Sequence, residues 1–214
     1  MQKYFIKTPW WARALFPSYV WRMPSKEKVV YLTFDDGPHP VATPWVLDQL
    51  KQYNAKATFF CIGNNVLQHN QIYQQIRAEG HAVGNHTFHH LNGWKTPAAT
   101  YLADVTAAGK VIESKLFRPP FGKITAGQAR GLKAALKEEK TKVIMWDVLS
   151  ADYDARLLPE ECTKNVLKNT GAGSIIVFHD SEKAFPNLKY TLPAVLKYLQ
   201  NDGYRFEEIL MDGL

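Results

Sequence analysis

Cysteine is scarce in this chain: two of its 214 residues are cysteine, so the sequence implies no disulfide framework. Cys61 lies in an apolar, strand-like run and Cys162 lies in a helical pattern. We therefore expect two small thiols that are buried or half-buried, although a single disulfide between them is compatible with the sequence.

Long hydrophobic runs are missing as well. No window reaches the ~20 apolar residues of a membrane-spanning helix. Residues 1–9 also lack the basic start, apolar core and small-residue cleavage site of a secretory signal. These absences predict a cytoplasmic protein without a transmembrane segment, with attachment to a membrane face or export as the alternatives.

The chain also lacks a stripe of charge of one sign, although its net charge is +6. Basic residues are interleaved with glutamates, as in residues 133–140, and this pattern is typical of a solvated helix face. We expect no nucleic-acid partner, because such a partner calls for a clustered basic surface.

What the sequence does contain is the composition of an ordinary globular protein, 46% hydrophobic and 21% charged. No composition break divides the chain, so we expect one domain over residues 29–214 and an N-terminal extension over residues 1–28. Residues 10–16 of the extension predict a short aromatic helix. We favour packing of this helix across an end of the domain over binding to a membrane surface, since so short a helix is unstable alone.

Apolar, strand-like segments alternate with helical patterns along the chain. The expected strands cover residues 29–32, 56–62, 81–84, 142–147, 174–178 and 203–206, and a further strand is expected just before residues 117–122. The expected helices cover 43–53, 70–79, 96–113, 125–139, 159–168 and 191–201. This α/β alternation is typical of a parallel sheet with right-handed crossovers, and about seven parallel strands suggest a distorted or incomplete (β/α) barrel. The functional residues of such folds lie at the C-terminal ends of the strands.

Two adjacent carboxylates, Asp35 and Asp36, follow the first expected strand, and Gly37-Pro38 ends that strand abruptly. Ionising both of two carboxylates so close together costs electrostatic free energy unless a cation or a hydrogen-bond donor separates them. We therefore expect a bound metal ion here. The alternative is a solvated turn, in which Asp, Gly and Pro are common.

The histidines favour the metal. Three of the seven, His86, His89 and His90, follow the third expected strand. A cation held by one carboxylate and two imidazoles, with positions left open, is typical of a catalytic zinc or related site. The i,i+4 spacing would place His86 and His90 on one side of a helical turn, but spacing alone does not exclude His89 in place of His90.

Four motifs resemble those of the NodB-homology polysaccharide deacetylases, carbohydrate esterases that remove N- or O-acetyl groups from amino-sugar polymers and xylan. The motifs are Thr-Phe-Asp-Asp-Gly-Pro at 33–38, His-Thr-Phe-His-His at 86–90, Arg-Pro-Pro-Phe-Gly at 118–122 and Val-Phe-His at 177–179. The resemblance extends from about Val29 to Phe206. It implies a divalent metal bound by Asp36, His86 and His90, zinc above all, with cobalt or another divalent ion as the alternative.

The resemblance also implies roles in acid–base chemistry. Asp35 would be the general base and His179 the general acid. Arg118 would orient and ionise Asp35, while Asp152 would keep His179 protonated. The backbone N–H of Phe121 would help to hold the oxyanion.

The remaining motif departs from the family pattern. Where the family usually has Asp-x-x-Asp-Trp, this chain has Leu149 and Tyr153 at the first and last positions, and Val177 stands where Leu is common. These differences bear on the shape of the groove and of the acetyl pocket, and hence on the choice of substrate. The predicted substrate contacts are Pro120, Phe121, Trp146, Tyr153 and Val177.

The sequence therefore predicts a metal-dependent hydrolase whose partner is an acetylated carbohydrate and which removes acetyl groups from N-acetylated amino sugars. Zinc lowers the pKa of a bound water from ~15.7 to about 7, so that the water can attack the acetyl carbonyl while Asp35 takes a proton and His179 protonates the leaving amine. The alternatives are an O-acetyl polysaccharide esterase of the acetylxylan type and a catalytically silent carbohydrate-binding relative.

Overall fold

The structure is a computed structural model that describes residues 4–213. Within them, parallel strands form a single curled sheet in the order β5-β4-β3-β2-β1-β7-β6, and β8 pairs with β1 beside this path. The strands are β1 (Val29–Asp35), β2 (Ala57–Cys61), β3 (Ala82–Asn85), β4 (Leu116–Phe117), β5 (Lys142–Val143), β6 (Val148–Leu149), β7 (Ile175–His179) and β8 (Arg205–Phe206).

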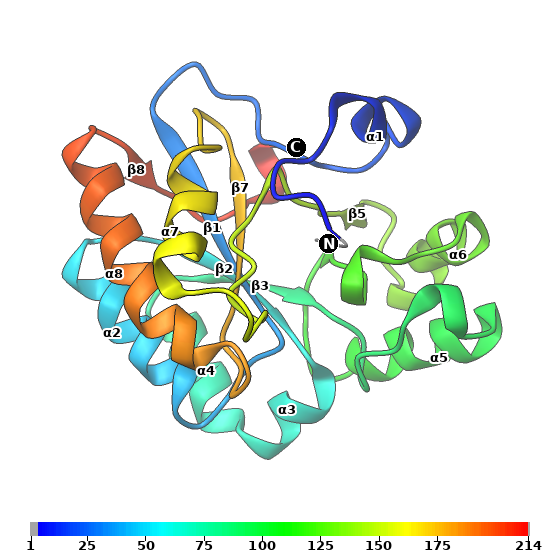
Figure 1. Cartoon of the computed structure of the whole chain (residues 1–214). Coiled ribbons are helices and arrows are strands. Elements are labelled where there is room, and N and C mark those ends of the chain that lie inside the picture. The colour runs from blue at the N-terminus through cyan, green and yellow to red at the C-terminus, as the bar shows by residue number, and fades with distance from the viewer. Residues whose placement is uncertain (1–3, 214) are drawn as a thin grey trace.

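Helices surround the strands on the outside of the sheet. They are α1 (Trp10–Leu15), α2 (Ala42–Gln52), α3 (Gly63–Gln68), α4 (Asn70–Ala78), α5 (Ala98–Ala108), α6 (Ala126–Leu136), α7 (Pro159–Leu167) and α8 (Phe185–Asn201). Helix α7 packs on α8 at the left of Figure 1, and α5 packs on α6 at the right. The predicted distorted (β/α) barrel is confirmed.

The barrel closes through a short irregular segment. Strands β5 and β6 stand at opposite ends of the strand order, yet only residues 144–147 separate them in the chain. Ile144 N–H still donates to the carbonyl of Phe117 in β4, whereas Asp147 N–H donates to the carbonyl of Ile175 in β7. The single strand expected over 142–147 is therefore wrong, because the chain leaves one edge of the sheet and joins the other within it.

The core is centred on β1. All seven residues of this strand are buried, as expected for a central strand that is covered on both faces. Phe34 stacks on Phe59 of β2 and on Phe178 of β7, with ring centroids 5.1 and 5.8 Å apart. Both cysteines are free and buried, which confirms the expectation of two small buried thiols.

The N-terminal segment lies across the seam between β5 and β6. Lys7 pairs antiparallel with Val148, and Val20 pairs with Ile144. Helix α1 itself buries no side chain, and Trp10 is 75% exposed, so the residues flanking the helix make the contacts that we expected of the helix. Residues 1–3 of the predicted extension lie outside the described residues.

Two predicted helix starts are wrong. A helix was expected to start at Thr43, but α2 begins at Ala42, and the Thr43 hydroxyl donates to Asp180 Oδ2. The last helix was expected to open at Thr191-Leu192-Pro193, but α8 begins at Phe185 and contains Pro193 in its interior. A proline usually marks a helix start because it lacks an N–H, and here the buried apolar face of α8 outweighs that local preference.

Residues 4–213 include no helix that is both long and apolar enough to cross a membrane. The predicted location of the protein stays a prediction.

Candidate functional site

A pocket of about 740 Å³ opens at the C-terminal ends of the strands. Its lining includes Asp35, Asp36, His86, His90, Trp146 and His179. Asp35 is the last residue of β1, and Asp36 has a φ of 80°. This left-handed turn is what lets two adjacent carboxylates face one pocket, because neighbouring side chains of a regular strand point to opposite faces.

Arg118 fixes Asp35. The Arg118 guanidinium is fully buried and its Nη1 donates to Asp35 Oδ1 over 2.7 Å and to Thr33 Oγ1 over 2.7 Å. Burial lowers the pKa of Arg118, while the neighbouring Asp35 opposes this shift. The predicted pairing of Arg118 with Asp35 is thus present, and one carboxylate oxygen of Asp35 is held by the pair.

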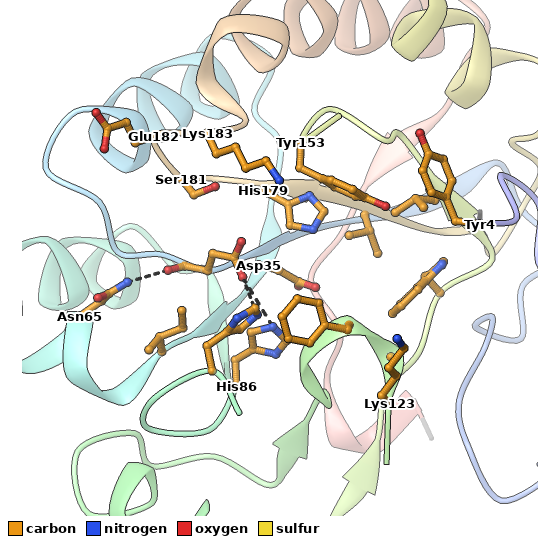
Figure 2. A pocket seen from close by; sticks show the side chains of 18 residues that line it. Tyr4, Asp35, Asn65, His86, Lys123, Tyr153, His179, Ser181, Glu182 and Lys183 are labelled. Atoms are coloured by element: carbon orange, nitrogen blue, oxygen red, sulfur yellow. Dashed lines mark hydrogen bonds and ion pairs between the residues drawn. The ribbon is translucent and has the colours of Figure 1, made fainter. Parts of the chain in front are cut away.

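Asp36, His86 and His90 converge. One ligand atom of each lies within 4.8 Å of the other two, and no other such group occurs among residues 4–213. His90 Nε2 is 3.1 Å from Asp36 Oδ1 and His86 Nε2 is 3.7 Å from the same oxygen. Figure 2 shows these contacts as dashed lines below Asp35.

Hydrogen bonding fixes the tautomer of His86. Its Nδ1 lies 2.7 Å from the carbonyl oxygen of Arg118, and a carbonyl can only accept, so Nδ1 bears the proton. In the neutral ring His86 Nε2 is then the unprotonated nitrogen, and it lies 3.7 Å from Asp36 Oδ1. Two acceptors aimed at each other suit a cation between them, so this donor set fits a divalent metal.

The charge states agree with that fit. Burial lowers the pKa of His86 to about 4, against the opposing charge of Asp35. Burial alone would raise the pKa of Asp36, but the hydrogen bond to His90 and the nearby His179 hold it well below the usual range of a carboxyl. At neutral pH the group offers a neutral imidazole beside an ionised carboxylate, which are the protonation states that metal ligands need.

The loop that presents the histidines is not helical. Thr87 and His90 have φ values of 63° and 56°, so the helical turn expected from the i,i+4 spacing is wrong, although His86 and His90 do meet. His89 points elsewhere, because its Nδ1 lies 2.6 Å from Asp104 Oδ1 and its side chain is 62% exposed. Of the two candidates, His90 and not His89 lies beside Asp36 and His86.

His179 and Asp152 form the second predicted pair. His179 Nδ1 is 2.8 Å from Asp152 Oδ1, and the backbone N–H of His179 donates to Asp152 Oδ2 over 2.9 Å. Burial would lower the pKa of His179, but the charge and hydrogen bond of Asp152 outweigh it and raise the pKa to about 9. The imidazole is therefore held in its protonated form at neutral pH.

Asp180 supports the site from behind. Its buried carboxyl group accepts from Gly37 N–H over 3.1 Å and from the Thr43 hydroxyl over 2.5 Å, and burial raises its pKa to about 8. A Cβ on Gly37 would stand 2.1 Å from Asp180 Oδ2, so the close approach requires glycine there. No sequence motif placed Asp180 in the site.

The predicted substrate contacts divide into two groups. Four of them line the pocket, namely Phe121, Trp146, Tyr153 and Val177. Pro120 is buried and does not belong to the lining. Phe121 has a φ of 59°, and its exposed ring lies 4.6 Å from the His90 ring, so this residue forms part of the wall beside the histidines.

Several lining residues were missed by sequence analysis. Asn65 donates from Nδ2 to the carbonyl of Asp36 over 2.8 Å, and Tyr4, Lys123 and Lys183 also line the pocket. No motif marks these positions, because the loops and the N-terminal segment that bring them there are placed by tertiary contacts. Figure 2 shows Tyr4 and Lys123 at the far side of the pocket from Asn65.

Known proteins resemble this chain closely. Residues 22–158 match a family model described as polysaccharide deacetylase. A peptidoglycan-N-acetylglucosamine deacetylase of Bacillus cereus is 35% identical over 192 residues, covering 87% of this chain and 88% of that protein. A chitooligosaccharide deacetylase of Azorhizobium caulinodans is 32% identical over 74% of this chain and 77% of its own length.

A solved structure shares the fold. The crystal structure of a peptidoglycan N-acetylglucosamine deacetylase in complex with 4-naphthalen-1-yl-N-oxidanyl-benzamide superposes with a TM-score of 0.79. It is 32% identical in sequence, and the match covers 90% of this chain and 91% of that one.

Proposed function

Because this chain belongs to the polysaccharide deacetylase family, we propose that it hydrolyses the acetamido group of N-acetylglucosamine units in peptidoglycan or in a related amino-sugar chain. The names of the two relatives described above support this class of substrate. The observation that most supports this proposal is that the donors Asp36, His86 and His90 lie in one pocket with Asp35 and His179.

We propose zinc as the ion for this donor set, since two imidazoles and one carboxylate with open positions are typical of catalytic zinc. When bound, such an ion polarises an acetyl carbonyl and lowers the pKa of a water molecule from ~15.7 to about 7. Asp36, His86 and His90 would hold it.

Asp35 serves as the general base in this proposal. One of its carboxylate oxygens is tied to Arg118, which leaves the other free to take a proton from the attacking water. Arg118 fixes the orientation of the carboxylate and favours its ionised form, because a buried cation stabilises an adjacent anion.

His179 serves as the general acid. Asp152 binds its Nδ1, so Nε2 is the nitrogen that delivers a proton to the departing amine. Both His179 and Phe121 line the pocket, and the backbone N–H of Phe121 is proposed to stabilise the developing oxyanion.

The decisive experiment measures acetate release from N-acetylated chitooligosaccharides and from peptidoglycan. We expect activity to vanish after chelation and to return with zinc or cobalt. The Asp35→Asn variant should bind zinc normally yet lose roughly 100-fold or more in kcat, the scale of a general base. Asp48→Asn, an exposed carboxylate on α2, is the matched control and should keep full activity.

Normal turnover by metal-free protein would contradict the metal proposal. Normal turnover by metal-loaded Asp35→Asn protein would contradict the role of Asp35. Release of acetate from acetylxylan alone would assign the chain to O-acetyl substrates instead.

A further inference from the structure

The N-terminal arm, defined here as residues 4–8, is held against the outer edge of the sheet. Lys7 forms an antiparallel bridge with Val148 of β6, and Leu149 N–H donates to the carbonyl of Ile6 over 2.8 Å. Backbone pairing of this kind sets the register of the arm, so each of its side chains has a defined direction.

Side chains fix the arm further along. Lys7 Nζ lies 2.7 Å from the buried carboxylate of Asp147 and donates to the carbonyl of Asn169 over 2.6 Å. Thr8 N–H donates to the carbonyl of Asp147 over 2.9 Å. The arm is thus attached at its end nearest α1, and the pairing with β6 directs its other end toward the pocket.

Tyr4 is the residue that the arm brings to the pocket. Its hydroxyl donates to Asp154 Oδ2 over 2.7 Å, and its ring packs edge to face on Tyr153 with centroids 5.8 Å apart. Tyr153 in turn packs edge to face on His179 at 4.9 Å. All three rings line the same pocket, and Figure 2 shows Tyr153 standing between His179 and Tyr4.

His179, Tyr153 and Tyr4 thus form an aromatic wall, which begins at the proposed general acid and extends away from the metal donors. Aromatic walls with a polar edge suit a pyranose ring, which has apolar C–H faces and hydroxyls around its rim. Lys183 Nζ lies 5.6 Å from the centre of the Tyr153 ring, so a hydrogen-bond donor stands beside the same wall.

We propose that Tyr4 and Tyr153 form a subsite for the sugar ring next to the acetylated one, and that the N-terminal arm therefore contributes to the substrate groove. This inference rests on the proposed function. Tyr4 lies outside the residues matched by the family model, which begin at residue 22, whereas Tyr153 lies within them.

The test compares ligands of different length in the zinc-loaded Asp35→Asn protein, which should turn substrate over slowly enough for binding to be measured. A single N-acetylglucosamine cannot occupy the reacting position and the subsite together, whereas its β-1,4-linked tetramer can. Tyr4→Ala should weaken the tetramer by roughly threefold to tenfold, the scale of one lost aromatic contact. Affinity for the monosaccharide should stay unchanged.

Two further variants define the readout. Tyr4→Phe keeps the ring and should keep most of the tetramer affinity. Tyr198→Ala removes an exposed tyrosine of α8 and should leave both affinities unchanged. Zinc content and thermal midpoint, measured on each variant, show whether the fold and the metal site are intact.

Unchanged tetramer affinity in Tyr4→Ala would overturn the subsite, as would equal weakening of tetramer and monosaccharide. A Tyr4→Phe variant as weak as Tyr4→Ala would also overturn it, since the ring would then not be the contact. Because the readout is binding, a wild-type protein that releases no acetate would end the proposed function while leaving the subsite to be judged by tetramer affinity.

Discussion

The guanidinium of Arg118 is fully buried, and each of its nitrogens donates a hydrogen bond. Besides Asp35, it donates from Nε to the carbonyl of Ile144 over 3.1 Å and from Nη2 to the carbonyl of Met145 over 2.9 Å. The face of Phe60 lies 4.0 Å from its central carbon. The same side chain therefore orients the proposed base and satisfies the carbonyls of the irregular segment that closes the barrel.

The protonation of His179 leads to a pH prediction for kcat/KM. Asp152 is what raises the pKa of His179 against the effect of burial, to about 9. A general acid must be protonated, so activity should fall as the pH rises through the pKa of His179. Asp152→Asn removes the negative charge that opposes the effect of burial, so the pKa of His179 should fall. The alkaline limb of the pH profile of kcat/KM should therefore move to lower pH.

Asn at position 152 keeps a carbonyl oxygen that can accept from His179, so the imidazole stays in place in this variant. Neighbouring carboxylates affect wild type and variant alike, and the comparison therefore isolates Asp152. An alkaline limb at the same pH in both proteins would show that Asp152 only positions the ring.

At the scale of elements, the loop from β1 to α2 is tied to the end of β7. Thr43 Oγ1 accepts from the backbone N–H of His39 over 2.7 Å and donates to Asp180 Oδ2 over 2.5 Å. This fully buried hydroxyl thus connects α2 to the strand that ends at His179. Helix, loop and strand are positioned together, and the loop includes Asp36.

Replacing Thr43 by valine tests that connection. The shape is kept, but a buried N–H and a buried carboxylate lose their common partner, which should lower the free energy of unfolding by about 1–3 kcal/mol. Thr100→Val, at an exposed position of α5, is the matched control and should change stability by less than about 0.5 kcal/mol. Urea denaturation measures both, and equal losses would show that the Thr43 bonds contribute nothing.

Elements were predicted best where the signal is local. Thr125 caps α6 with a full capping box, and α7 begins at Pro159 as expected. Positions decided by tertiary contacts were missed: Thr43 resembles a helix cap in sequence but bonds to Asp180 across the fold. His86 and His90 meet through a loop with left-handed residues, which no helical spacing describes.

At the scale of the whole molecule, alternating strands and helices were enough to predict a barrel, and motif order was enough to predict its working end. The closure was not predictable, because residues 142–147 have the pattern of one apolar strand, whereas β5 ends at Val143 and β6 begins only at Val148. The sheet is completed there by contacts with the distant N-terminal segment, such as the pairing of Lys7 with Val148. Tyr4 was not predicted as a pocket residue because the same tertiary contacts place it there.

Because the N-terminal arm completes the sheet between β5 and β6, we predict that an ion pair in the arm stabilises the entire domain. Lys7 Nζ lies 2.7 Å from Asp147, whose side chain is fully buried, and Arg13 and Arg22 stand farther away at 4.0 Å each. Lys7→Met leaves a buried carboxylate without its close cation. It should lower the free energy of unfolding by roughly 1–3 kcal/mol, which is below the value for a fully buried pair because Lys7 is partly solvated.

The control is Lys28→Met, which breaks the pair of Lys28 with Asp202, in which both side chains are 52% exposed. It should lower the free energy of unfolding by less than about 1 kcal/mol. Urea denaturation compares the two variants, and an equal loss in both would show that the arm lies on the barrel without stabilising it.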